Sequence, residues 1–271
     1  MAAERKYELT KNMMVYYYTV LYQIRAVKDF KPGEKDDDHP IVKKGDLGGW
    51  IEGEENLSHE GSCWVEDNAM VFGNAKVYDD AIVSENANVY GNAEVYGSAL
   101  VYGNAKVLNN SKIFGSAKVF GSAVIGGNAN ILGEAEVSGY TTVKGNAVIE
   151  GRAIVEGTKL KEWYGKKSNA LVIDGGANIR YHAEIHDKYD FFTFDLPWLS
   201  CPTVTWTKDS WAIGWGLLDM FDAEAGRIDD DYFINLVKDR YDDEDQEEIA
   251  KRCVEIAHLL EKVAAKKRGE K

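Results

Sequence analysis

The sequence predicts a mainly β protein: a parallel β-helix shaped as a triangular prism, with an N-terminal β cap and a small C-terminal α+β domain. The main observation is a period of six residues. From Val65 to Val155 every sixth residue is Val or Ile. A small residue, nearly always Ala, stands four positions after each of them except Val155, and Gly most often stands two positions after. This period is typical of a hexapeptide-repeat parallel β-helix.

The period also predicts which side chains point inward. Residues two apart in a strand lie on one face, so each Ala and the next Val, such as Ala75 and Val77, line the interior. Gly turns each corner, replaced at some steps by Asp, Glu or Asn, because the bend needs a left-handed backbone that most side chains oppose. Three hexads then make one coil of about 18 residues, and coils stack about 4.8 Å apart.

Residues 1–64 precede the regular repeat and are interpreted as an N-terminal cap, because an uncovered first coil would expose unpaired backbone. Residues 18–26 alternate as a strand, and Trp50 and Trp64 are the expected core of the cap. Counting back in sixes starts the repeat at His59, which stands where Val belongs. Residues 65–186 form the predicted β-helix, with a Lys-rich insert near 159–170 that leaves and rejoins it in phase.

Residues 187–271 are interpreted as the C-terminal α+β domain. Three strands are predicted over 190–194, 203–207 and 211–215, the last two joined as a hairpin. Three helical patterns follow: one over 217–225, a second that opens at Asp229 and a third that begins at Asp242. The domain is expected to cap the far end of the β-helix.

Several motifs resemble those of a group of bacterial and phage hexapeptide-repeat proteins, whose members are often labelled transferases or left without a function. The resemblance covers about residues 7–155, and it is carried by the segments 46–50 (DLGGW) and 61–65 (GSCWV) and by the Val-Tyr-Gly-Asn-Ala repeats. It implies a left-handed coil and, from the wider superfamily of acyltransferases and γ-class carbonic anhydrases, frequent trimers. It brings no catalytic residue to this chain.

Composition excludes some classes of function. The chain of 271 residues has a net charge of −13, which disfavours a general nucleic-acid binder, because such proteins neutralise phosphates.

No apolar run is long enough to cross a membrane, and the polar N-terminus lacks a signal-peptide core, so we expect a cytoplasmic protein of a bacterial cell. The three cysteines are too far apart for a disulfide framework or zinc motif. We expect no cofactor and no metal.

Histidine is the usual base of transferases with this fold, since a hydroxyl or amine nucleophile must lose a proton near neutral pH. Of the five histidines, His182 and His186 are the weak catalytic candidates, because both point outward on the coils that resume after the insert. His39, His59 and His258 are expected to be structural or solvated. A third ligand that would complete a metal site with the pair is not visible in the sequence.

Aromatic residues are the more prominent surface feature. The residue after each Val or Ile points outward, and residues 18 apart should stack as ladders on the three prism faces. The predicted ladders, which are the candidate binding residues, are Tyr78, Tyr96, Phe114 and Leu132; Phe72, Tyr90 and Leu108; and Tyr102 and Phe120. Ring stacking between coils accounts for them. Alternatively, one ladder is covered by a symmetry mate in a dimer or trimer, by the insert or by a partner protein.

The sequence favours a non-catalytic protein-interaction scaffold, in a phage or host-defence setting by resemblance, because the stretch from Val65 to Val155 contains neither a break nor a histidine. One alternative is a hexapeptide-type transferase acting at a trimer interface. Another is a protein that sequesters a small molecule such as a nucleotide.

Overall fold

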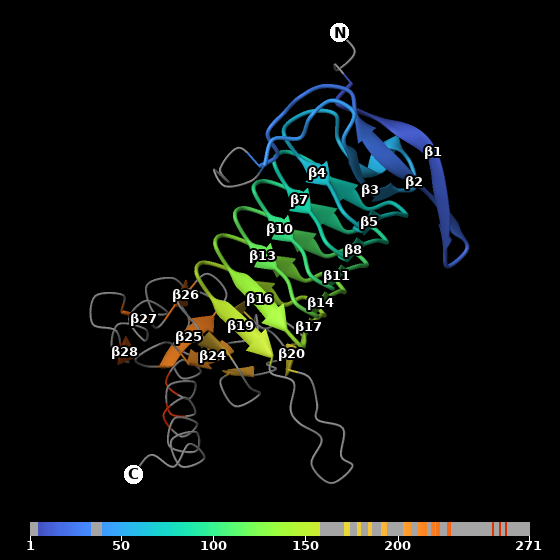
Figure 1. Ribbon diagram of the computed structural model, residues 1–271. Helices are drawn as coiled ribbons and strands as arrows, with labels where there is room; N and C mark the ends of the chain where they lie inside the picture. Colours follow the sequence, from blue (N-terminus) through green and yellow to red (C-terminus); the bar gives the residue numbers. More distant parts are fainter. Residues whose placement is uncertain are drawn as a thin grey trace.

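The chain folds as the predicted parallel β-helix, with three sheets that run along its length (Figure 1). The computed structural model describes residues 5–33 and 40–157. Beyond them it describes short strands between residues 171 and 228 and three helical residues, Lys251, Glu255 and His258. Among these described residues no helix is both long and apolar enough to span a bilayer.

Each coil contributes one short strand to each of three sheets. The nine-stranded sheet contains β1 (Tyr7–Tyr16), β2 (Thr19–Ala26), β3 (Leu47–Ile51), β5 (Met70–Val71), β8 (Asn88–Val89), β11 (Lys106–Val107), β14 (Val124–Ile125), β17 (Thr141–Val143) and β20 (Leu171–Ile173). The seven-stranded sheet contains β4 (Trp64–Val65), β7 (Ile82–Val83), β10 (Leu100–Val101), β13 (Lys118–Val119), β16 (Glu136–Gly139), β19 (Ile154–Gly157) and β22 (Glu184–Ile185). The six-stranded sheet contains β6 (Lys76–Val77), β9 (Glu94–Val95), β12 (Lys112–Ile113), β15 (Asn130–Ile131), β18 (Val148–Ile149) and β21 (Asn178–Ile179).

The core is the predicted stack of Val, Ile and Ala. Val101 is fully buried and pairs in parallel with Val83 of the preceding coil and Val119 of the following coil, each 18 residues away in the chain. The Ala residues of the second register, such as Ala99, are also fully buried. Because burying one Val side chain is worth about 1.5–3 kcal/mol, the repeat itself supplies most of the stability of the β-helix.

The corners also follow the prediction. Gly103 has a φ of +73°, and Asp79 and Asn109 adopt +56° and +61° at equivalent corners. At one edge of the prism, Asn side chains of successive coils form an amide ladder. Its hydrogen bonds of 3.0, 2.9, 3.0 and 2.9 Å join Asn74, Asn92, Asn110, Asn128 and Asn146 in that order.

The N-terminal cap merges with the first coil. Strands β1 and β2 form an antiparallel hairpin, of which the sequence predicted only the second strand, and β3 connects it to the solenoid through the pair Ile51 and Val71. The prediction that the repeat starts at His59 was wrong. Leu57 pairs with Val77 and takes the position of Val in the first coil. Two extra residues between Leu57 and Val65 shift the count. The 3-10 helix η1 (Glu54–Asn56) lies in this coil.

Both tryptophans predicted for the core of the cap lie on strands of the first coil. Trp64 is buried and its ring meets Phe30 at 5.2 Å, which confirms its core position. Trp50 is only half-buried: both tryptophans precede an inward residue and so point outward, but Trp64 is packed against the rings of Phe30 and Tyr7.

The repeat of six residues resumes in phase after the insert, as predicted. Val143 pairs with Ile173, a separation of 173 − 143 = 30 residues, which is 12 more than the 18 of a regular coil. The same separation joins Ile149 to Ile179. The predicted insert over 159–170 itself lies outside the described residues.

Part of the C-terminal region is an antiparallel sheet of β23 (Phe191–Thr193), β24 (Thr203–Trp206), β25 (Trp211–Trp215) and β26 (Leu218–Asp219), and β24 contacts β21 and β22 of the solenoid. The three predicted strands and the hairpin are confirmed. The predicted helix over 217–225 is wrong, because β26 and β27 (Phe221–Asp222) occupy it, the latter paired with β28 (Arg227–Ile228). As β26, this segment forms backbone hydrogen bonds with the edge of β25, whereas a short isolated helix is only marginally stable in water.

Candidate functional site

The aromatic ladders form as predicted. On the six-stranded sheet, the ring centroids of Tyr78 and Tyr96 are 4.8 Å apart and those of Tyr96 and Phe114 are 4.9 Å apart, with planes within 4° of parallel. Tyr102 and Phe120 stack at 4.9 Å on the seven-stranded sheet. The spacing equals the distance between neighbouring strands, so the coils themselves hold the rings in face-to-face contact.

The geometry of the ladders decides what they can bind. In a stack along the solenoid axis, each inner ring such as Tyr96 has both faces occupied by its neighbours, and only its edge points outward. A nucleobase or a sugar binds an aromatic residue through a free ring face. The three-ring ladder of the six-stranded sheet therefore presents mainly hydrophobic ring edges, which suit packing against protein side chains better than stacking of a planar ligand.

The tyrosine hydroxyl groups stay protonated. The Tyr78 hydroxyl donates a hydrogen bond of 3.2 Å to Oε2 of Glu94, and burial, together with this carboxylate, raises the pKa of Tyr78 well above its ordinary value. Burial likewise raises the pKa of Tyr96 and Tyr102. These groups therefore act as neutral hydrogen-bond partners and are poor candidates for a phenolate nucleophile.

The ladder on the nine-stranded sheet is partly covered by the chain itself. Phe72 and Tyr90 stack at 5.1 Å, and Tyr16 at the tip of the β1–β2 hairpin meets the Phe72 ring edge-on at 5.7 Å. In Figure 1 the hairpin runs down beside this sheet from the N-terminal end. The sequence suggested a symmetry mate, the insert or a partner as a cover, but not the N-terminal hairpin.

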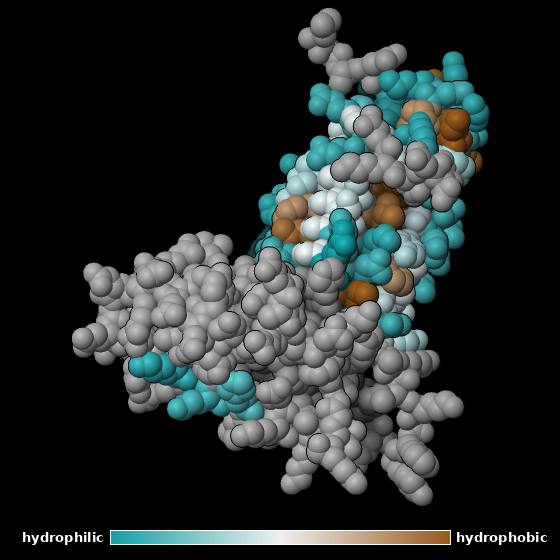
Figure 2. All heavy atoms as spheres, turned by 90° about the vertical axis from the view of Figure 1, so that its left-hand side faces the viewer, coloured by the Kyte–Doolittle hydropathy of each residue, from teal (hydrophilic) through white to brown (hydrophobic). Residues whose placement is uncertain are grey.

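A shallow groove runs along the edge where the six-stranded sheet turns into the seven-stranded sheet. It has a volume of about 440 Å³ and is lined by Gly61, Asp79, Asp80, Gly97, Ser98, Gly115 and Ser116. Figure 2, which views this side of the solenoid, shows a pale strip of weakly polar surface with hydrophobic patches on both sides. Asp79 accepts the backbone N–H of Gly97 at 3.2 Å, and Asp80 accepts the Ser62 hydroxyl at 2.7 Å, so both carboxylates stabilise turns.

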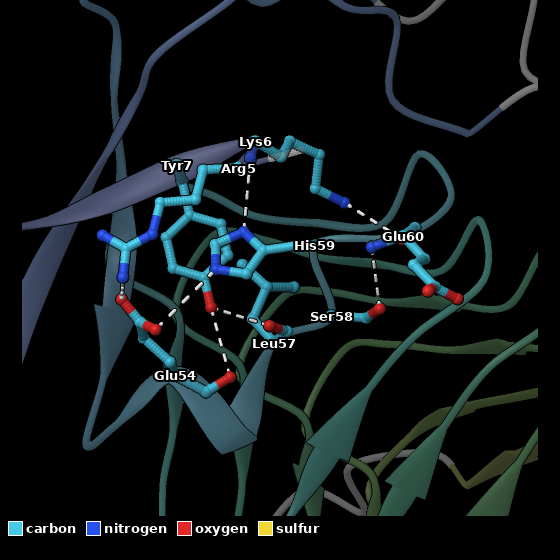
Figure 3. A network of polar contacts seen from close by, with 8 residues as sticks. All are labelled: Arg5, Lys6, Tyr7, Glu54, Leu57, Ser58, His59 and Glu60. Carbon is cyan, nitrogen blue, oxygen red and sulfur yellow. Dashed lines mark hydrogen bonds and ion pairs between the residues drawn. The ribbon is translucent and has the colours of Figure 1, made fainter. Parts of the chain in front are cut away.

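A polar network that the sequence pattern does not indicate fastens β1 to the first coil (Figure 3). The His59 ring stacks on Tyr7 at 4.2 Å, and its Nδ1 accepts the backbone N–H of Lys6 at 3.2 Å. A neutral imidazole that accepts at Nδ1 carries its proton on Nε2, which lies 4.0 Å from Oε2 of Glu54. Burial lowers the pKa of His59. His59 thus has no free lone pair with which to act as a base, in agreement with its predicted structural role.

Lys6 and Cys63 form a buried pair within the same cap. Nζ of Lys6 lies 3.3 Å from Sγ of Cys63 and donates to the carbonyl oxygen of Gly61 at 3.2 Å. Burial lowers the pKa of Lys6 and raises the pKa of Cys63, with the contact between them acting in the opposite direction on each. A thiol of this kind is protonated and enclosed, which makes it a structural rather than a nucleophilic cysteine.

The remaining histidines do not add to a site within the described residues. His182, His186 and His39 lie outside the part of the chain that the structure describes, so the catalytic candidates are untested. His258 lies in a helix. Across the described residues, no three His, Cys, Asp or Glu side chains are grouped to hold a metal ion.

Comparison with known proteins gives one informative similarity. No protein-family model matches the sequence. The chain is 36% identical over 78 residues to the uncharacterized acetyltransferase YdcK of Escherichia coli (strain K12). The matched region is 26% of this chain and 21% of the relative, so the chain spans only about a fifth of that protein. The similarity and the solenoid together support a hexapeptide-repeat type of β-helix.

Proposed function

We propose that this protein is a rigid protein-binding rod whose contact surface is the ladder of Tyr78, Tyr96 and Phe114 on the six-stranded sheet. The observation that carries the proposal is the geometry of this ladder, in which three parallel rings 4.8 and 4.9 Å apart present their edges on one flat face. Aromatic residues are enriched at the centres of protein interfaces, where they contribute much of the binding energy.

The choice among the three ladders follows from their surroundings. The ladder on the nine-stranded sheet already contacts Tyr16 of the hairpin, and the seven-stranded sheet carries only the pair Tyr102 and Phe120. All three ladders are half-buried, but the six-stranded ladder has the most rings, and the ion pair of Glu94 and Lys112, 3.2 Å apart, lies beside it. A hydrophobic stripe bordered by charges resembles the core and rim of a protein interface.

The test compares two matched double variants. Tyr96→Glu with Phe114→Glu disrupts the proposed surface, whereas Tyr102→Glu with Phe120→Glu makes the same chemical change to another ladder with the same 4.9 Å stacking. The wild type and the two variants are each immobilised as bait and incubated with bacterial lysate, because the motifs resemble those of bacterial and phage proteins, and captured proteins are identified by mass spectrometry. We expect a protein that binds the wild type and the Tyr102/Phe120 variant but does not bind the Tyr96/Phe114 variant. Capture of the same proteins by all three folded baits would exclude this surface.

Acyl transfer is the second candidate, favoured by the similarity to a protein named as an acetyltransferase and by the edge groove. His182 or His186 would serve as the base, at an interface between subunits. The test incubates the protein with acetyl-CoA and a panel of amine and hydroxyl acceptors and follows release of the free thiol. Turnover that disappears in His182→Ala or His186→Ala supports an enzyme, and thiol release no faster than the blank argues against it.

A further inference from the structure

The tip of the β1–β2 hairpin combines exposure with backbone strain. Tyr17 and Tyr18 form its two-residue turn, with φ values of +48° and +75°. This turn type favours Asn-Gly, because other residues are strained in the left-handed region. Both tyrosines are nevertheless exposed, Tyr17 by 77% and Tyr18 completely, so burial within the chain does not compensate for the strain. Strained backbone of this kind often marks a functional contact.

The outer face of the same hairpin is apolar. Residues directly opposite one another share a face of a two-stranded ribbon, and Val15 pairs with Val20. Val15 is 72% exposed, Val20 is 39% exposed and the neighbouring Met13 is 63% exposed. The opposite face contacts the solenoid, where Leu21 is fully buried. The hairpin is therefore hydrophobic on both sides, although only one side is covered.

We infer that a second copy of this chain docks its own hairpin face to face against this surface. A contact around a two-fold axis brings a patch against itself, which favours a patch without charge. Residues 12–24 contain no Asp, Glu, Lys or Arg, in a chain whose net charge is −13. The same net charge disfavours the other obvious occupant, a bilayer with anionic lipids.

The size of the patch fits a dimer. With about 200 Å² for an aromatic side chain, Tyr17, Tyr18, Met13, Val15 and Val20 together expose roughly 600 Å². A stable complex buries about 800 Å² on each partner, which the flanking strand residues bring within reach. This inference does not rest on the proposed function, because the hairpin and the six-stranded ladder are different surfaces.

The experiment measures mass by light scattering and sedimentation equilibrium of the full chain over a range of concentrations. The wild type should approach twice the chain mass of 30.3 kDa. Val20→Lys should raise the dissociation constant at least tenfold. The matched control is Val172→Lys, which alters a strand residue of similar exposure, 44%, at the other end of the same sheet and should leave the dimer unchanged.

A second variant separates association from folding. Tyr17→Asn combined with Tyr18→Gly relieves the strained turn and makes the protein monomeric, so its melting temperature should equal or exceed that of the monomeric Val20→Lys variant, which keeps the strained turn. A monomeric wild type at 100 micromolar or a dimer that survives both hairpin variants would overturn the inference. So would hairpin-dependent sedimentation with vesicles of phosphatidylcholine and phosphatidylglycerol by a protein that stays monomeric.

Discussion

Substitution of one corner glycine, Gly103→Ala, tests the stacking of the coils most directly. Gly103 has a φ of +73°, and an added Cβ would lie 2.8 Å from the backbone N and 2.9 Å from the backbone O of Gly121 in the next coil. The left-handed conformation costs a non-glycine residue about 1–2 kcal/mol. The clash involves backbone, so the coils must part locally, and the neighbouring hydrogen bond of 2.7 Å from Asn104 N–H to the Gly121 carbonyl weakens.

A weakened hydrogen bond costs about 0.5–1.5 kcal/mol, and the smaller entropy of the unfolded Ala variant returns about 0.4–1 kcal/mol. The net loss of stability is therefore roughly 0.5–3 kcal/mol. For a chain of this size, that corresponds to a decrease of the melting temperature of roughly 1–12 °C. Thermal unfolding followed by circular dichroism measures it.

The control is Gly126→Ala. Gly126 lies outside the left-handed region, and its added Cβ would come no closer than 3.5 Å to Leu108 Cγ and 3.6 Å to Asn109 Nδ2. Its melting temperature should stay the same or rise by a few degrees, because Ala restricts the unfolded chain. Equal melting temperatures for the Gly103 and Gly126 variants would refute the reasoning about the corner.

Three further predictions concern the core and the cap. Val101→Asp should abolish cooperative melting, because an unpaired buried carboxylate costs several kcal/mol; an unchanged melting curve would contradict the inward position of Val101. Tyr7→Phe should destabilise the protein by about 1–3 kcal/mol in urea, because the Leu57 carbonyl loses its hydrogen bond of 2.7 Å; equal stability would mean that water replaces the hydroxyl. Burial lowers the pKa of Lys6, so the unfolded chain binds more protons between that lowered pKa and the ordinary value of 10.5, and stability should rise with pH there. Relative to Lys6→Met, the wild type should gain stability as the pH rises toward 10.5, and Cys63, whose raised pKa acts in the opposite direction, is present in both proteins; parallel curves would show that Lys6 titrates as an exposed lysine.

The regular part of the fold could be predicted because its contacts repeat at one short separation. Val83, Val101 and Val119 touch because each coil has 18 residues, and the same count places Tyr96 over Tyr78. Counting failed where two extra residues enter the first coil. There Leu57 replaced His59 at the position of Val, and a pattern of side-chain types cannot reveal such an insertion before the partner strand is known.

The cap network was harder to anticipate, because its contacts join residues about 50 positions apart. Lys6 reaches Cys63 and Tyr7 reaches Leu57 only after β1 has been placed beside the first coil. A buried lysine next to a cysteine has no sequence signature. The signal for the hairpin was present in the uncharged and tyrosine-rich stretch over 12–24, but the covering of Phe72 by Tyr16 depends on the direction in which the hairpin bends.

By itself, the sequence determined the solenoid, its inward Val and Ala, its glycine corners and its outward ladders, since a period of six residues admits one way of burying the apolar side chains. Only the tertiary structure decided which ladder the chain covers, where the first coil begins and which nitrogen of His59 carries the proton. These features depend on contacts between segments that do not share the repeat, and the energies of such contacts follow from their relative placement in space.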